Sequence, residues 1–238
     1  MSTNADKIPT VGGFFLSKRQ AFRASTILIV LLLSIFSAKS SFLKSLKENK
    51  WVIHLFSFAC FYGCSMWVTF VAGLVMFKSL PRHVFGKLQA KLFPKYFQFS
   101  ILWIIISLGM EVVVLYDYHQ SPQMNSDMKK LLMPKKQSCI LFAILVMLLI
   151  NLYVLEPKTT KIMFKRHVVE RKMNTGHEVG VTKPAPSILE AAEKSDVELL
   201  ASLSKEFGKL HGMSASLNLL ALIFGTWHLC WLGSLIQI

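Results

Sequence analysis

The chain has 238 residues, of which 53% are hydrophobic and 17% are charged, and its mean hydropathy is +0.47. This balance excludes an ordinary soluble domain and is typical of membrane proteins. The formal net charge of +14 does not indicate nucleic-acid binding, because Lys and Arg lie at the ends of apolar runs, where the lipid bilayer and its anionic headgroups are the expected partners.

Residues 1–50 are predicted to form an N-terminal extension to a membrane domain at 51–238. The extension has a basic start and an apolar segment at 24–38. The 15 residues of this segment extend only about 22 Å as a helix. They indicate an anchor or a signal peptide, so a retained span, a cleaved signal peptide and an interfacial helix all stay open.

Four long apolar runs follow, at about 52–77, 97–116, 138–155 and 213–236. A helix needs about 20 mostly apolar residues to cross the roughly 30 Å hydrocarbon core of a bilayer. Only helices and closed barrels satisfy every backbone polar group there, and these runs are continuous rather than alternating. We therefore predict an all-α, polytopic membrane helix bundle with four core transmembrane helices plus an N-terminal fifth.

The distribution of Lys and Arg favours the fifth span. With five spans, the N-terminus, 78–96 and 157–211 share one side and carry 19 of these residues, against 8 on the other side. With four spans the counts are 15 and 12. Because cytosolic loops carry the excess of Lys and Arg, we expect 78–96 and 157–211 in the cytosol.

The run at 52–77 carries a stripe of small and polar residues, Ser65, Thr69 and Gly73, at helical spacing. Such stripes pack helices together in lipid. Cys60 and Cys64 also share a helical face, with Met66 near them, and sulfur ligands select soft ions such as Cu(I). The alternative is ordinary apolar packing. His54 lies near the start of the run, where we expect the membrane interface.

Residues 79–93 indicate a basic amphipathic helix on the membrane surface, which Pro94 is expected to end. Arg82 and Lys91 belong to its basic face. The alternative is a connector whose lysines simply follow the positive-inside rule.

Polar residues inside the next two runs are functional candidates. Glu111 lies in the run at 97–116, and a carboxylate near the middle of a membrane indicates function unless it reaches the interface. Asn151 and Glu156 lie near the end of the run at 138–155. All three residues fit either interhelical hydrogen bonds or a polar path for a solute or a proton.

The region 157–211 is the largest polar stretch. Its first part is expected to continue the third span past Pro157, residues 174–186 form a flexible linker, and 187–210 form a helix. We expect this region to pack on the cytosolic end of the bundle, and a partner-binding hairpin is the alternative. The last run then carries a stripe of polar and small residues at steps of three and four: His211, Ser214, Asn218, Ala221, Gly225 and His228.

Several uncommon strings resemble the transmembrane protein 205 family. They are Trp67–Gly73, the run Lys78–Pro94, Tyr96 with Phe97, Asn151, Leu155–Pro157, Thr159 with Thr160, His211 with Gly212, Ser214 and Asn218. The resemblance covers 52–236 and implies a four-helix membrane domain without an agreed biochemical activity. Residues 1–50 depart from it. Among its positions, we expect Arg82 or Lys91 to pair with Glu156.

The sequence carries no Walker A, GxGxxG, HExxH or CxxC…CxxC pattern. No cofactor, catalytic residue or metal site is therefore predicted beyond the soft-metal alternative, although an intramembrane enzyme using His83, His211 or His228 is conceivable. We expect a non-enzymatic membrane-organising or trafficking factor of the endoplasmic reticulum, secretory pathway or plasma membrane. The alternative is a small transporter or efflux component for a solute or soft metal, with a path along the last helix and a homo-oligomeric assembly.

Overall fold

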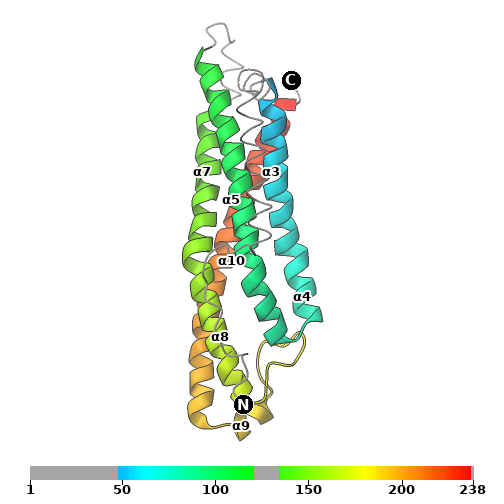
Figure 1. Cartoon of the computed structure of the whole chain (residues 1–238), viewed down its shortest axis with the longest axis vertical. Helices are drawn as coiled ribbons and strands as arrows, with labels where there is room; N and C mark the ends of the chain where they lie inside the picture. Colours follow the sequence, from blue (N-terminus) through cyan, green and yellow to red (C-terminus); the bar gives the residue numbers. More distant parts are fainter. Residues whose placement is uncertain (1–47, 121–133, 237–238) are drawn as a thin grey trace, which may run out of the picture. The chain divides into compact units, whose positions relative to one another are not determined.

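The computed structural model describes residues 48–120 and 134–236. The predicted segment 24–38 lies outside these residues, as does most of the connection at 117–136. Of two compact units, Met1–Val52 and Ile53–Ile238, the second contains nearly all of the described helices (Figure 1).

The first span consists of α3 (Lys50–Trp67), a π-helical turn η1 (Val68–Ala72) and α4 (Gly73–Ser79). In η1 the Gly73 N–H donates to the carbonyl of Val68, five residues earlier. Such wide turns are rare and frequently mark functional sites. Thr69 of the predicted stripe lies in this turn.

A single helix, α5 (Arg82–Gln120), contains both the basic segment 79–93 and the second span. The prediction that Pro94 ends a separate surface helix is wrong, since Pro94 lies inside α5. Proline removes only one backbone donor, and long membrane helices tolerate it where neighbouring groups compensate. The basic amphipathic segment is thus the first part of a spanning helix.

The third span is α7 (Pro134–Ile150), continued by a second π-helical turn η2 (Asn151–Leu155) and by α8 (Glu156–Lys172). The expected continuation past Pro157 is confirmed, because Pro157 is the second residue of α8, which follows η2 without a break. Asn151 opens η2, so both π-helical turns begin at or next to a predicted polar residue.

The last span belongs to α10 (Lys194–Ile236), which follows the short helix α9 (Pro186–Ala191). The predicted helix at 187–210 is therefore wrong in its bounds: it breaks between α9 and α10, and its second part is continuous with the span. Gly208 and Gly212 do not interrupt α10, because glycine weakens a helix without removing a backbone hydrogen bond.

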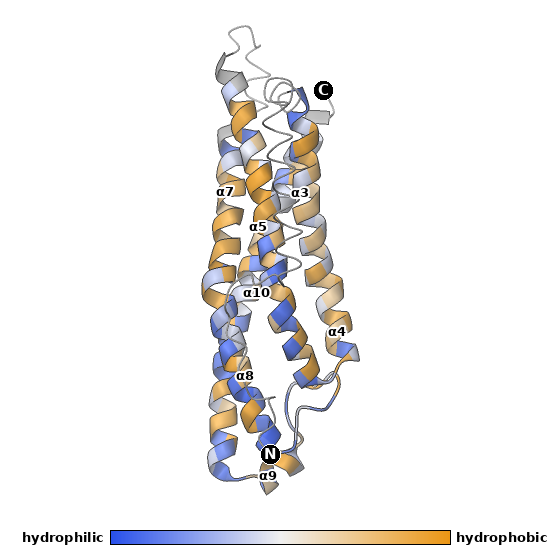
Figure 2. Ribbon diagram, in the orientation of Figure 1, coloured by the Kyte–Doolittle hydropathy of each residue, from blue (hydrophilic) through white to orange (hydrophobic). Residues whose placement is uncertain are grey.

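Four helical segments are long and apolar enough to cross a membrane, namely Lys50–Ser79, Arg82–Tyr116, Lys136–Lys172 and Lys194–Ser234. The predicted all-α membrane bundle is confirmed. Large apolar side chains remain exposed on every segment, and the colouring of Figure 2 shows orange residues along the spans. Such a surface is stable in lipid and not in water.

The basic end of the bundle, made by 78–96 and 157–211, includes a hairpin of α8 and the first part of α10. Here α8 packs against α10 around five buried residues: Ile162, Val169, Met173, Leu200 and Leu203. Figure 2 shows hydrophilic residues gathered on this part of α8 and α10. The region 157–211 therefore packs on the bundle, as expected. Its linker is tied down by backbone hydrogen bonds to α5.

Candidate functional site

A buried polar cluster joins all four spanning helices at the end of the bundle opposite the basic end. This distal cluster consists of His54 of α3, Ser107 and Glu111 of α5, Gln137 of α7 and His228 of α10. His54 Nδ1 lies 2.9 Å from the Ser107 carbonyl oxygen, and its Nε2 lies 2.9 Å from His228 Nε2. His228 Nδ1 lies 3.0 Å from Gln137 Oε1. His54 is fully buried within the bundle.

Glu111 completes the distal cluster as its only carboxyl group. One carboxyl oxygen lies 3.8 Å from His54 Nε2, and both side chains are 0% exposed. Neither oxygen accepts a hydrogen bond within the described part of the chain. Glu111 is therefore enclosed within the bundle, and its depth in the membrane stays a prediction.

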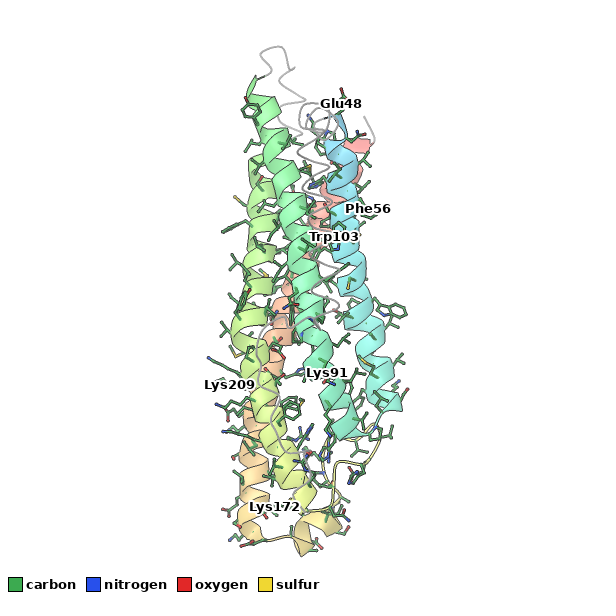
Figure 3. All side chains as sticks on the ribbon, in the orientation of Figure 1. Glu48, Phe56, Lys91, Trp103, Lys172 and Lys209 are labelled. Atoms are coloured by element: carbon green, nitrogen blue, oxygen red, sulfur yellow. The ribbon has the colours of Figure 1, made fainter. Side chains whose placement is uncertain are left out.

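Aromatic rings enclose the two imidazoles. The Phe58 ring centre lies 4.7 Å from that of His228, and the Trp231 ring centre lies 5.3 Å from it. Nearby, Phe56 of α3 and Trp103 of α5 pack edge to face. Figure 3 labels both residues. Because His54, Glu111 and His228 are each 0% exposed, electrostatic interactions inside the distal cluster are strong.

A middle network lies nearer the basic end and again centres on α10. It consists of Ser65, Thr69, Tyr96, Asn151, Ser214 and Asn218. The Tyr96 hydroxyl donates to Asn218 Oδ1 at 2.7 Å and lies 3.0 Å from Ser65 Oγ. Asn218 Nδ2 donates to Thr69 Oγ1 at 2.8 Å. Ser214 Oγ donates to Asn151 Oδ1 at 2.6 Å.

Only some residues of the predicted stripe on α10 contact other helices. Ser214 and Asn218 bond to neighbouring helices, and Ala221, Gly225 and His228 are buried. His211 is exposed instead and stacks on Phe207 of its own helix. Gly73 is half-buried, in contact with the Val68 carbonyl of η1.

Apolar residues separate the distal cluster from the middle network. This apolar layer consists of Phe58, Phe61, Ile104, Ile144 and Leu222, all of them buried. About ten residues of α10 lie between Asn218 and His228, which is a rise of about 15 Å. The two polar groups are therefore distinct sites in this conformation.

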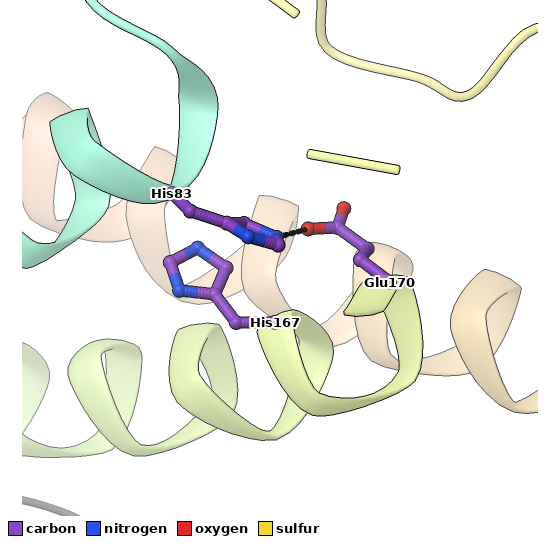
Figure 4. Close-up of side chains that lie close together, drawn as sticks. All are labelled: His83, His167 and Glu170. Atoms are coloured by element: carbon purple, nitrogen blue, oxygen red, sulfur yellow. Dashed lines mark hydrogen bonds and ion pairs between the residues drawn. The ribbon is translucent and has the colours of Figure 1, made fainter. Parts of the chain in front are cut away.

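A third cluster lies at the basic end, between the first turn of α5 and the end of α8. This basic-end cluster consists of Arg82, His83, Arg166, His167 and Glu170. Figure 4 shows His83 Nε2 donating to Glu170 Oε2, at 2.8 Å. Arg166 Nε donates to Glu170 Oε1 at 2.9 Å, and Arg82 Nε lies 3.3 Å from the same oxygen. The carboxylate is fully buried and held by three cationic or donor groups.

The linker after α8 closes this cluster from the other side. His83 N–H donates to the Gly176 carbonyl, and Arg82 N–H donates to the Glu178 carbonyl, both at 3.1 Å. These bonds satisfy two of the free donors at the start of α5. Gly176 has φ +99°, and a Cβ there would lie 2.1 Å from the His83 imidazole. The predicted flexible linker is thus an ordered strap, residues 174–182.

The predicted pairing of Arg82 or Lys91 with Glu156 is wrong. Arg82 pairs with Glu170 and Glu178, and Lys91 is exposed on α5 (Figure 3). Glu156 accepts a hydrogen bond from Thr160 at 2.7 Å, four residues along the same helix. Arg82 turns toward the strap because the strap and α8 supply two carboxylates there.

The basic-end cluster has the residue types of a metal site. One ring nitrogen each of His83 and His167 and a carboxylate oxygen of Glu170 lie within 4.8 Å of one another. These are ligands that zinc uses. Arg82 and Arg166 already neutralise Glu170, however, so a divalent ion would bring uncompensated positive charge into a buried site. The geometry favours an ion-pair network over a metal centre.

The soft-metal candidates lie apart from these clusters. Cys60 and Cys64 are half-buried free thiols on α3, and Met66 is 39% exposed. Cys139 and Cys230 are exposed on α7 and α10. Sulfur ligands for a metal at Cys60 and Cys64 stay a prediction.

Comparisons with known proteins agree with this architecture. A family described as a domain of unknown function, DUF4149, matches residues 56–168. Transmembrane protein 205 of Danio rerio is 27% identical over 186 residues, which cover 76% of this chain and 90% of that protein. The chain is related to transmembrane protein 205. The predicted resemblance to the transmembrane protein 205 family is confirmed, and neither match indicates an enzyme family. No solved structure matches the chain significantly.

Proposed function

We propose that this multi-pass membrane protein is a small, non-enzymatic transporter that moves protons along the inner side of α10. One observation carries the proposal: the polar residues of α10 meet side chains from each of the other spanning helices. His228 meets His54 and Gln137, Ser214 meets Asn151, and Asn218 meets Tyr96 and Thr69.

The apolar layer closes this path in the present conformation. A hydrophobic constriction between polar sites blocks water and ions until it opens. The two π-helical turns supply local adjustments of helix register next to the middle network. In this proposal, the apolar layer keeps the transporter in an occluded state.

Helix packing alone is the competing explanation. Interhelical hydrogen bonds in membranes contribute about 0.6 to 2 kcal/mol each, which explains why Asn218 and Ser214 are bonded. It does not explain Glu111, because an ionisable group inside the bundle costs free energy that a leucine would not. A proton-carrying role explains Glu111 and the two buried imidazoles together.

The test is proton flux in liposomes that contain the full-length protein and an internal pH-sensitive dye, driven by a potassium gradient with valinomycin. We expect flux above that of protein-free vesicles, and a several-fold loss in Asn218→Leu. Ser216→Leu is the matched control, because Ser216 is exposed on the same helix two residues away. Equal dye responses in vesicles with and without properly inserted protein would contradict the proposal.

A second, organising or trafficking function is favoured by the exposed face of α5. Lys87 and Lys91 are exposed there beside the exposed apolar residues Val84 and Leu88. This combination binds anionic headgroups at a membrane surface. It fits residence in the endoplasmic reticulum, the secretory pathway or the plasma membrane.

Native mass spectrometry with phosphatidylserine tests this second function and reports any homo-oligomer in the same spectra. The double variant Lys87→Gln with Lys91→Gln should retain fewer anionic lipids than the wild type. Lys136→Gln, exposed at the opposite end of the bundle, should not differ from the wild type. The same lipid retention in all three proteins would exclude the basic face of α5 as the lipid site.

A further inference from the structure

The hydrogen atoms of the distal cluster can be assigned from its acceptors. A backbone carbonyl only accepts, so the 2.9 Å contact between His54 Nδ1 and the Ser107 carbonyl requires a hydrogen on Nδ1. Ser107 Oγ, 3.2 Å from the same nitrogen, can share that hydrogen. The remaining nitrogen of His54, Nε2, faces His228.

At the other end of this chain of hydrogen bonds, His228 also faces an acceptor. Gln137 Oε1 faces His228 Nδ1 at 3.0 Å, which places a hydrogen on Nδ1. The two Nε2 atoms, 2.9 Å apart, need one further hydrogen between them. Two imidazoles then hold three hydrogens on their four ring nitrogens, so the pair carries one positive charge.

Glu111 supplies the matching negative charge. Its carboxyl oxygen lies 3.8 Å from His54 Nε2, with both side chains fully buried. Within residues 48–120 and 134–236, the ionisable groups that face each other here are His54 from α3, Glu111 from α5 and His228 from α10, while α7 contributes the neutral Gln137. A single buried charge would be costly, whereas an imidazolium pair with one carboxylate is neutral overall.

A second arrangement keeps the same number of protons. If the Gln137 amide rotates, its NH₂ group donates to His228 Nδ1, and both imidazoles become neutral. The extra proton then resides on the Glu111 carboxyl group, which is again neutral. In both arrangements every ring nitrogen of His54 and His228 keeps a hydrogen bond.

We propose that His54, His228 and Glu111 together form a proton-binding site that holds one exchangeable proton. For the proton to reside on Glu111, the carboxyl group must move within hydrogen-bonding distance of His54 Nε2 and take the hydrogen shared by the two Nε2 atoms. His228 must then take the tautomer with its hydrogen on Nε2, while the Gln137 amide rotates to donate to Nδ1. Loss of the proton from the cluster leaves a buried carboxylate beside two neutral imidazoles. The site therefore releases its proton only when water or another cation reaches it.

The role of this proton-binding site in transport rests on the proposed function. Opening of the apolar layer would give the middle network access to the cluster, and the proton would leave through Asn218 and Tyr96. The site itself exists whether or not transport occurs, so binding and flux are measured separately.

The test uses the full-length protein in nanodiscs, labelled with ¹⁵N-histidine, with His54→Asn and His228→Asn variants assigning the resonances. At neutral pH we expect either a hydrogen-bonded imidazolium signal from this pair or an infrared band of a protonated Glu111 carboxyl. Both signatures should be lost in Glu111→Gln. His211→Gln, which removes an exposed histidine of α10, should change neither.

A second variant keeps the proposal testable if Glu111→Gln does not fold. Gln137→Met removes the acceptor of His228 Nδ1, so the proton should shift to Glu111 and the infrared band should grow at the expense of the imidazolium signal. Neutral imidazoles with no protonated carboxyl in the wild type would overturn the proposal, as would an imidazolium signal that persists in folded Glu111→Gln. A proton signature without flux in liposomes supports the site and contradicts the transporter.

Discussion

Arg82 and Glu170 form an ion pair, 3.3 Å between Nε and Oε1, that connects the first residue of α5 with the end of α8. Glu170 is fully buried and also binds Arg166 and His83. Because one carboxylate balances several cationic or donor groups from two helices, its removal should have consequences beyond a single hydrogen bond.

Glu170→Gln should destabilise the protein by about 3 kcal/mol, since it removes the carboxylate that pairs with Arg166, whose side chain is 13% exposed, and leaves Arg82 with Glu178 alone. Thermal unfolding in detergent measures this. Asp196→Asn is the matched control: it removes a pairing with Lys172, which is 62% exposed, and should cost less than about 1 kcal/mol. Equal losses of stability in the two variants would show that the basic-end cluster stabilises the protein no more than an exposed ion pair does.

Gly176→Ala should release the strap from α5. At φ +99° an L-residue is strained, and a Cβ would also overlap the His83 imidazole at 2.1 Å. Gly180→Ala separates the two effects, because Gly180 has φ +69° and open space around it. We expect limited proteolysis at 174–186 to be much faster in Gly176→Ala than in Gly180→Ala. Similar cleavage rates would mean that the contact with His83 does not hold the strap.

The strap should also loosen in acid. Burial raises the pKa of Glu178, but hydrogen bonds from Thr175 and the Gly176 N–H, together with Arg82, outweigh it and hold this pKa below its usual value of 4.5. A lowered pKa in the folded state means that the stabilisation is present above pH 4.5 and is lost as the pH falls through the lower, folded value.

Proteolysis of the strap at decreasing pH, with an acid-stable protease, measures this loss. Glu178→Gln should weaken the pH dependence, and the loss of protection that remains in acid comes from protonation of Glu170, which pairs with Arg82 and His83. Glu190→Gln is the control, because Glu190 is an exposed acid of the neighbouring helix α9. A wild-type strap that stays protected in acid would contradict the assigned role of Glu178.

The spans were predictable because lipid imposes a one-dimensional signal: each crossing needs one long apolar run. The inner face of α10 was predictable for a related reason, since Ser214, Asn218 and Gly225 recur at helical spacing. These features depend on neighbours along the chain, which a sequence displays directly.

The clusters were not predictable, because their members are distant in sequence. A single histidine near the start of a run gives no sign that His54 meets His228, 174 residues later. One pattern in the sequence could have indicated the basic-end cluster: an Arg-His pair occurs at Arg82-His83 and again at Arg166-His167. No feature of the sequence indicated the π-helical turns at 68–72 and 151–155.

The predicted helix end at Pro94 was wrong because it rested on the local preference of proline and not on the packing of the residues around it. Proline disfavours helix for the preceding residue, yet α5 continues past it. The next residues, Tyr96 and Phe97, are buried against the bundle, and their packing outweighs the local preference.

Phe61→Ala should raise proton flux if the apolar layer is the barrier of the path. Phe61 is 0% exposed and lies between the distal cluster and the middle network on α3. Removal of its ring leaves a cavity next to Gly225 and Tyr62, through which water can bridge the two polar sites. Liposome flux, normalised to inserted protein, should therefore exceed that of the wild type.

Phe142→Ala is the control for this experiment, because Phe142 is a phenylalanine 57% exposed on α7. It should leave flux unchanged. Because a buried Phe→Ala change costs about 3 to 5 kcal/mol, Phe61→Leu provides a milder variant that should give an intermediate increase. Flux that falls in both Phe61 variants while the protein stays folded would place the barrier elsewhere, since a thinner barrier cannot slow a proton that crosses it.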